Sequence, residues 1–222
     1  MPATPVKAVD CPSGAATVTA GGVRCAFVMA TAAEYGAALR RRVRPFLVHV
    51  GPVEAALHTA RLLEREPVDL VVSLGSAGSA RLTQGGVHQV SRLSYRDMDA
   101  SALGFAPGLT PFLGLPATIE VPHRVPGVPA ATLATGASIV SGDAYRAIDA
   151  DMVDMESYAV MRACMEAGTA FVGLRGISDG ARPLSGLEDW TRLLHVVDAG
   201  LAGAVDALLE ALGRGGLDAL RT

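Results

Sequence analysis

Short apolar runs recur along the chain, and this recurrence constrains its fold more than any other feature. They are expected to be strands, and they occupy residues 23–30, 46–50, 68–74, 131–135 and 170–174. Helical spacing follows several of them, at 31–39, 53–63, from about 154 onward, and at 187–212. Strands that are apolar at every position are buried on both faces, as in parallel sheets covered by helices. The sequence therefore predicts a single α/β domain with a central mixed, mostly parallel sheet flanked by helices.

The length and composition fit one globular domain. Half of the 222 residues are hydrophobic and 18% are charged, enough for a large core. Residues 1–22 show no strong periodicity and are read as a variable N-terminal segment, so residues 23–222 form the expected domain.

Charge and hydropathy exclude some partners. The net charge is −3, and the arginines at 40–42 are the longest block of like charge, so no nucleic-acid footprint is expected. The apolar runs are too short for a membrane span and the N-terminus lacks the order of a signal peptide, which predicts no membrane partner and a cytoplasmic location.

The sequence indicates neither a metal nor another cofactor. Cys11, Cys25 and Cys164 are odd in number and lack metal-ligand spacing, so they are read as reduced thiols. Asp97 and Asp99 lie close together, but they lack a histidine or a third carboxylate at a fixed spacing.

Two acids mark a candidate site. Glu156 lies at the start of an expected helix and Asp179 just past an expected strand, where open α/β sheets hold ligands. Taken singly, Glu156 is equally a favourable charge in a first helical turn, and Asp179 a cap or turn residue. Ser178 is expected to orient Asp179. Arg175 is costly to bury unpaired and is expected to meet Glu156 or a ligand oxygen.

Two glycine-containing turns are further candidates. Ser76 and Ala77 lie between Gly75 and Gly78, where a turn without Cβ atoms lets backbone N–H groups approach a ligand. A tight turn with no ligand explains these residues as well. Tyr145 follows a Ser-Gly-Asp turn and is either a ring that stacks on a planar ligand or a core tyrosine.

Four motifs in order resemble those of the purine nucleoside phosphorylase and nucleosidase superfamily, and most closely the 5′-methylthioadenosine/S-adenosylhomocysteine nucleosidases. The motifs are Val-Val-Ser-Leu-Gly-Ser-Ala-Gly at 71–78, Ser-Gly-Asp-Ala-Tyr at 141–145, Val-Asp-Met-Glu at 153–156 and Leu-Arg-Gly-Ile-Ser-Asp at 174–179. The resemblance extends over residues 23 to about 205.

The resemblance implies roles for the site residues. Asp179 matches the acid that protonates N7 of the base, and Glu156 matches the carboxylate that binds the ribose hydroxyls. Met155 would pack on the sugar. Tyr145 would stack on the base, and the backbone of Arg146 would read the base edge.

The resemblance also bears on the nucleophile. Phosphorylases of the superfamily carry a phosphate-binding arginine at the position of Ser73, so water is favoured here. Glu34 would be the general base for that water, with Ser76 and Arg175 placing it. The acids of the nucleosidases directly follow a methionine, whereas Glu34 is displaced by two residues relative to that pattern.

The family's pocket for the 5′ substituent is apolar. Leu187 or Trp190 would complete it, together with an aromatic position of a neighbouring subunit close to Leu103 or Phe105, so a homodimer is expected. The proline-rich stretch 106–129 is expected to be a long loop that can reshape this pocket.

The predicted function is metal-free hydrolysis of the N-glycosidic bond of a purine nucleoside, a 5′-modified adenosine such as methylthioadenosine or S-adenosylhomocysteine, with release of adenine. Adenosine, futalosine-like and lipid-linked nucleosides stay open as substrates. One alternative is a phosphate-dependent phosphorylase that recruits phosphate through Arg24 or Arg96. The other is a nucleoside-binding protein without catalysis.

Overall fold

The computed structural model describes residues 17–180 and 182–221. Its strands are β1 (Val18–Ala20), β2 (Val23–Met29), β3 (Phe46–Leu47), β4 (Leu70–Gly78), β5 (Val87–Tyr95), β6 (Thr118–Glu120), β7 (Ala130–Thr135), β8 (Met152–Asp154) and β9 (Ala170–Asp179). Its α-helices are α1 (Ala37–Arg40), α2 (Pro52–Arg65), α3 (Ser157–Ala167), α4 (Leu187–Thr191) and α5 (Leu194–Gly215). Its 3-10 turns are η1 (Ala32–Glu34), η2 (Ser101–Leu103), η3 (Gly142–Ala147) and η4 (Gly216–Leu220).

The strands form one mixed sheet, as predicted. β2 pairs in parallel with β3 and β4, β4 with β9, and β7 with β5 and β8. Antiparallel pairs join β4 to β8 and β5 to β9, so five strands close a ring in the order β4, β9, β5, β7, β8. Three strands of this ring end at or beside candidate site residues: β4 ends at Gly78, β8 just before Met155, and β9 at Asp179.

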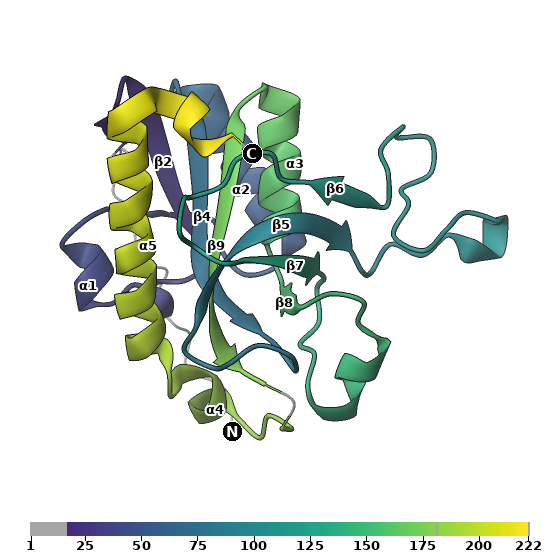
Figure 1. Cartoon of the computed structure of the whole chain (residues 1–222). Coiled ribbons are helices and arrows are strands. Elements are labelled where there is room, and N and C mark those ends of the chain that lie inside the picture. The colour runs from purple at the N-terminus through teal and green to yellow at the C-terminus, as the bar shows by residue number, and fades with distance from the viewer. Residues whose placement is uncertain (1–16, 181, 222) are drawn as a thin grey trace, which may run out of the picture.

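Helices cover both faces of the sheet (Figure 1), and successive residues of its strands alternate between two cores. On β2, Cys25, Phe27 and Met29 pack in the core beneath α5, while Ala26 and Val28 pack in the core beneath α2 and α3. This alternation explains why the strand sequences are apolar at every position.

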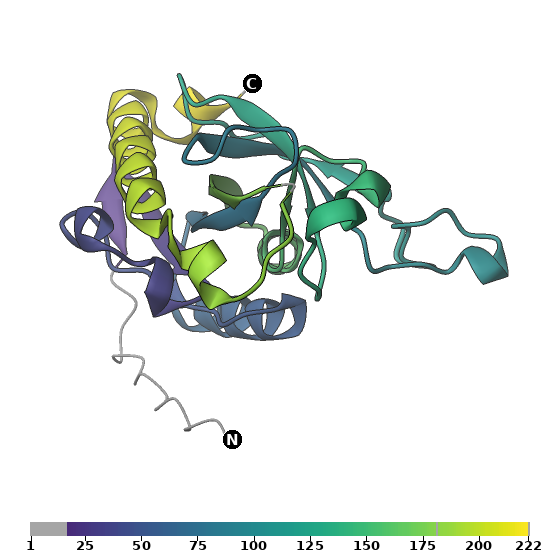
Figure 2. The same cartoon turned by 90° about the horizontal axis from the view of Figure 1, so that it is seen from below.

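One segment projects from this body. Residues 96–117 run out beyond β5 and return to β6, and both views show them extending away from the sheet (Figures 1 and 2). This projecting arm carries exposed apolar side chains, of which Phe112 is 96% exposed and Leu103 is 78% exposed.

Several element boundaries differ from the prediction. Residues 75–78 are not a turn but continue β4, because β9 pairs with β4 from Leu70 to Gly78. The helix expected at 31–39 is split into η1 and α1, since Asp198 accepts hydrogen bonds from the N–H groups of Gly36, Ala38 and Leu39 and caps a new helix.

Two further differences lie near the chain ends. The helix expected at 187–212 is split into α4 and α5, with Arg192 and Leu193 between them. Residues Val18–Ala20, placed by the sequence in a variable segment, pair with β2 as β1. Cys11 lies outside the described residues.

Within residues 17–180 and 182–221, no helix is long and apolar enough to cross a membrane.

Gly176 lies where β9 meets α5 at close range. A Cβ at this position would lie 2.5 Å from Val197 Cγ1 and 2.9 Å from Val197 Cγ2. Val197 is buried and branched at Cβ, so it has little freedom to move.

We expect Gly176→Ala to lower the free energy of unfolding by about 1–3 kcal/mol through overpacking, measured by urea unfolding. Gly203→Ala is the control: it lies on α5 with nothing within 4 Å of a new Cβ, and it should stabilise the protein by about 0.5–1 kcal/mol. Equal effects of both changes would contradict the packing argument.

Candidate active site

Three carboxylates from distant parts of the sequence line one cavity of about 260 Å³. Glu34 ends η1 after β2, Glu156 is the N-cap of α3 after β8, and Asp179 is the last residue of β9. The side chains of Glu34 and Asp179 are buried, at 5% and 8% exposure. Burial of acids around one cavity makes their protonation states the main chemical property of the site.

Glu34 reaches the cavity although it is displaced from the family pattern. Its Oε1 accepts hydrogen bonds from the N–H of Ser76 at 2.7 Å and from the Ser76 hydroxyl at 2.6 Å. Burial raises the pKa of Glu34, while the bonds from Ser76 and the charge of Arg175 oppose that rise. A carboxylate with a raised pKa, held beside a cavity, suits a general base.

Asp179 is oriented by two hydroxyl groups. Ser178 donates to its Oδ1 at 2.7 Å, as the sequence predicted, and Tyr145 donates to its Oδ2 at 3.4 Å, a long bond. Burial raises the pKa of Asp179 and favours its protonated form. Gly78 makes this arrangement possible, since a Cβ there would lie 2.2 Å from the Tyr145 hydroxyl and 2.8 Å from Asp179 Oδ2.

Glu156 accepts a hydrogen bond from the N–H of Gly51 at 2.9 Å. Gly51 has φ +99°, a left-handed conformation that favours glycine, and it precedes the first residue of α2. Burial and the nearby charge of Asp154 raise the pKa of Glu156 to about 8. Met155 lines the cavity beside it.

Arg175 lies beneath the cavity rather than in it. Its Nε donates to Asp154 Oδ2 at 3.0 Å, so its ionic partner is Asp154 and not Glu156 or a ligand oxygen as expected. One terminal nitrogen donates to Ser73 Oγ and Ser157 Oγ, and the other to the carbonyls of Ser73 and Leu174. These bonds engage all five N–H groups of the guanidinium, which leaves no donor for a water or a phosphate.

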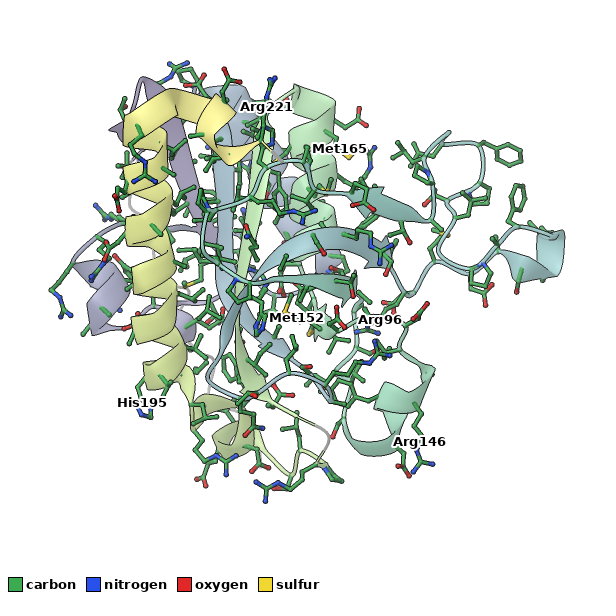
Figure 3. The ribbon with its side chains drawn as sticks, in the orientation of Figure 1. Arg96, Arg146, Met152, Met165, His195 and Arg221 are labelled. Atoms are coloured by element: carbon green, nitrogen blue, oxygen red, sulfur yellow. The ribbon has the colours of Figure 1, made fainter. Side chains whose placement is uncertain are left out.

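Most residues predicted from the sequence line the cavity, and four do not. Those in its wall are Glu34, Ser76, Ala77, Gly78, Met155, Glu156, Ser178, Asp179 and Trp190. Arg175 lies below the wall. Leu187 is 72% exposed and outside it. Tyr145 touches Asp179 from outside the wall, and the side chain of Arg146 is exposed and paired with Asp143. Figure 3 shows Arg146 directed outward on η3, with Arg96 lying further in.

Sequence reasoning gave no site role to several wall residues, namely Ala30, Thr31, Val50, Ser138, Ile139, Val140, Val153, Asp154 and Leu184. Asp154 was detectable, because an arginine on an apolar strand needs a carboxylate partner and Asp154 stands in the Val-Asp-Met-Glu motif. The residues at 138–140 carry no such signal, since they are small or apolar.

Arg96 also lines the cavity, and the sequence named it only as an alternative phosphate ligand. Its guanidinium donates to Asp97 and to the hydroxyl and carbonyl of Ser138. Among the described residues, no group of three or more His, Cys, Asp or Glu side chains has the geometry of a metal site.

The raised pKa of Glu156 predicts a pH-dependent effect on stability. A folded-state pKa of about 8 against an ordinary value of 4.5 means that the folded protein binds a proton more tightly than the unfolded chain. The stability that this proton binding contributes to the folded state is fully present below pH 4.5, weakens as pH rises and is lost above about pH 8. We expect Glu156→Gln to raise Tm relative to wild type, and to raise it more at pH 9 than at pH 6, because glutamine cannot ionise. Each kcal/mol of added unfolding free energy should raise Tm by ~2–4 °C.

Asp206→Asn is the control in the same calorimetric series. Arg42 holds the pKa of Asp206 below its ordinary value of 3.8, so its titration window lies below pH 6. Its Tm difference from wild type should stay constant between pH 6 and pH 9. If the Tm difference between Glu156→Gln and wild type were also the same at pH 6 and pH 9, the raised pKa of Glu156 would be refuted.

Comparison with known proteins places this geometry in a family. The family model described as the phosphorylase superfamily matches residues 15–210. The 5′-methylthioadenosine/S-adenosylhomocysteine nucleosidase of Colwellia psychrerythraea is 31% identical over 154 residues, covering 59% of this chain and 63% of that protein. The Bacillus subtilis nucleosidase of the same name is 33% identical over 151 residues, covering 59% and 64%. These alignments span less than two thirds of the length of either relative.

Solved structures show the same fold at lower identity. The Colwellia psychrerythraea nucleosidase in complex with adenine has a TM-score of 0.72 at 24% identity, covering 84% of this chain and 94% of that one. The futalosine hydrolase of Helicobacter pylori has a TM-score of 0.73 at 18% identity, covering 84% and 97%. With the family model matching most of its length, this chain belongs to the phosphorylase superfamily.

Proposed function

We propose that this chain is a purine nucleosidase that hydrolyses the N-glycosidic bond of a 5′-modified adenosine, such as methylthioadenosine or S-adenosylhomocysteine, and releases adenine. One observation carries the proposal: buried Asp179 and buried Glu34 face a single cavity with Glu156 in its wall. Such a cavity offers an acid for the leaving base and a base for the attacking water. The names of the relatives described above support the same substrate class.

The chemistry follows from these groups. Protonated Asp179 gives its proton to N7 of the purine, and the bond between C1′ and N9 breaks with its electron pair leaving on the base. The oxygen of water bonds to C1′ and its proton passes to Glu34. Glu156 accepts hydrogen bonds from the ribose hydroxyls, which strengthen as the sugar becomes oxocarbenium-like.

The surroundings of Glu34 favour water over phosphate. Ser73 stands where the phosphorylases carry an arginine, and its hydroxyl accepts from Arg175 instead. Because Arg175 is fully engaged, a phosphate beside Glu34 would meet a carboxylate without a free N–H of Arg175 to balance it.

Arg96 supports a second candidate, a phosphate-dependent phosphorylase, because it places a cation in the cavity wall. Arg24 does not support it, since Arg24 pairs with Asp69 and lies outside the wall. Strict dependence of adenine release on added phosphate would establish this candidate and reject hydrolysis.

The acid role of Asp179 is tested by adenine release from methylthioadenosine, S-adenosylhomocysteine and adenosine, followed by chromatography with and without phosphate. Asp179→Asn should lower kcat at least ~10²-fold, since general acid catalysis contributes about 10²–10⁴-fold. Wild-type activity should fall as pH rises through the raised pKa of Asp179, because only its protonated form donates. Asp143→Asn, an exposed carboxylate on η3, is the control and should retain activity. Nucleoside binding without adenine release from any substrate would favour the non-catalytic alternative.

We further propose a homodimer in which the projecting arm of one subunit reaches the cavity of the other. The arm exposes Leu103 and Phe112, and the cavity mouth exposes Ile139 and Val50 at 71% and 53%. Mutual burial of these apolar groups would remove an exposed patch from water. Light scattering should give twice the chain mass, and Leu103→Asp with Phe112→Asp should give a monomer. A monomeric wild type at micromolar concentration would contradict this proposal.

A cytoplasmic location is part of the proposal. Cys25 and Cys164 are free thiols in the structure, as expected in a reducing compartment.

A further inference from the structure

Trp190 is the only tryptophan in the sequence, and its side chain makes a polar contact in the site. Its indole Nε1–H donates to Ser76 Oγ at 2.9 Å. The same Ser76 hydroxyl donates to Glu34 Oε1 at 2.6 Å, and the Ser76 N–H donates to that oxygen at 2.7 Å. These bonds form a chain from α4 through β4 to Glu34.

The direction of this chain is fixed by the donors that it contains. An indole nitrogen can only donate, whereas a serine hydroxyl has one hydrogen and two acceptor sites. Once Ser76 Oγ accepts from Trp190, its single hydrogen is free to point at Glu34. A phenyl ring in place of the indole would keep an aromatic side chain but remove the donor, so the hydroxyl would lose one of the two contacts that orient it.

The position of Trp190 depends on the segment that carries it. The short helix α4 follows the chain from Arg182 to Gly186, where the N–H of Leu184 donates to Ser141 Oγ at 2.7 Å. Both Leu184 and Trp190 line the cavity. The segment after β9 thus contributes two things to the cavity: apolar side chains in its wall, and a polar contact that leads through Ser76 to Glu34.

We propose that Trp190 is a positioning residue whose indole N–H aligns the Ser76 hydroxyl on Glu34. Its role in catalysis rests on the proposed function, in which Glu34 is the general base. The alignment itself is a property of the folded chain and is testable without substrate.

Several charges face Glu34 and set the background for this test. Arg175 from β9 lowers the pKa of Glu34, while Asp154 from β8 and burial raise it. Glu156 from the start of α3 interacts with Glu34 in the same cavity. The two bonds from Ser76 add to the effect of Arg175 in keeping the carboxylate ionised.

Trp190→Phe removes the donor and keeps an aromatic ring, which makes it the decisive variant. We expect kcat to fall by up to about tenfold, the value of one lost hydrogen bond, with KM within about twofold of wild type. The acidic limb of the pH profile of kcat should move to higher pH, because Glu34 ionises at higher pH when its hydrogen bond from Ser76 is weaker. Glu188→Gln, an exposed change on the same helix, should leave both quantities unchanged. A fall in kcat or a rise in KM without movement of the limb would overturn the proposal and assign Trp190 to packing alone.

The fluorescence of Trp190 gives a readout that needs no catalysis. In wild type, its emission should change with pH as Glu34 ionises, because the indole donates to the hydroxyl that contacts this carboxylate. Glu34→Gln should abolish that transition and Glu156→Gln should retain one. A transition that survives Glu34→Gln would overturn the proposal. If no nucleoside is cleaved but the transition behaves as expected, the proposed function fails and the alignment stands.

Discussion

The buried ion pair between Arg175 and Asp154 is the interaction on which the site depends. Both side chains are almost fully withdrawn from water, at 3% and 1% exposure. Arg175 belongs to β9 and Asp154 to β8, and the remaining bonds of the guanidinium reach β4 and the first turn of α3. Removing one partner of such a pair leaves an uncompensated charge, which typically costs about 3–5 kcal/mol. The pair therefore holds together the strands and the helix start that carry Glu156, Asp179 and Ser76.

The ion pair also affects the acids that line the cavity. Asp154 lines the cavity and Arg175 lies just below it, and their charges act on Glu34 and Glu156 together with burial and short-range hydrogen bonds. Asp179 has hydroxyl donors, Glu34 has Ser76, and Glu156 has one backbone N–H. Burial raises the pKa of all three groups, and each carboxyl group has its own set of hydrogen-bond donors.

The sequence predicted the sheet and its acids because their signals are local. Continuous apolar runs specified strands buried on both faces, and Ser178 beside Asp179 specified its own contact. The extent of β4 through Gly78 was not predictable from glycine content, since pairing with β9 overrides the turn preference. The reach of Glu34 was equally hidden, because it depends on Asp198, which is 164 positions further along and caps the turn after Glu34. Tyr145 was expected to stack on the base; the structure places its hydroxyl beside Asp179 Oδ2, which the absence of a Cβ at Gly78 allows.

The closed ring of β4, β9, β5, β7 and β8 has a consequence for the behaviour of the protein at high concentration. A strand with an unpaired edge offers N–H and C=O groups to other molecules and can seed aggregation. The longest strands of the sheet, β4, β5 and β9, have neighbours on both edges. The strands left at the margins, β1, β3 and β6, are only two or three residues long. Closure of the ring thus protects the chain against edge-to-edge polymerisation while leaving one end of the ring open to a ligand.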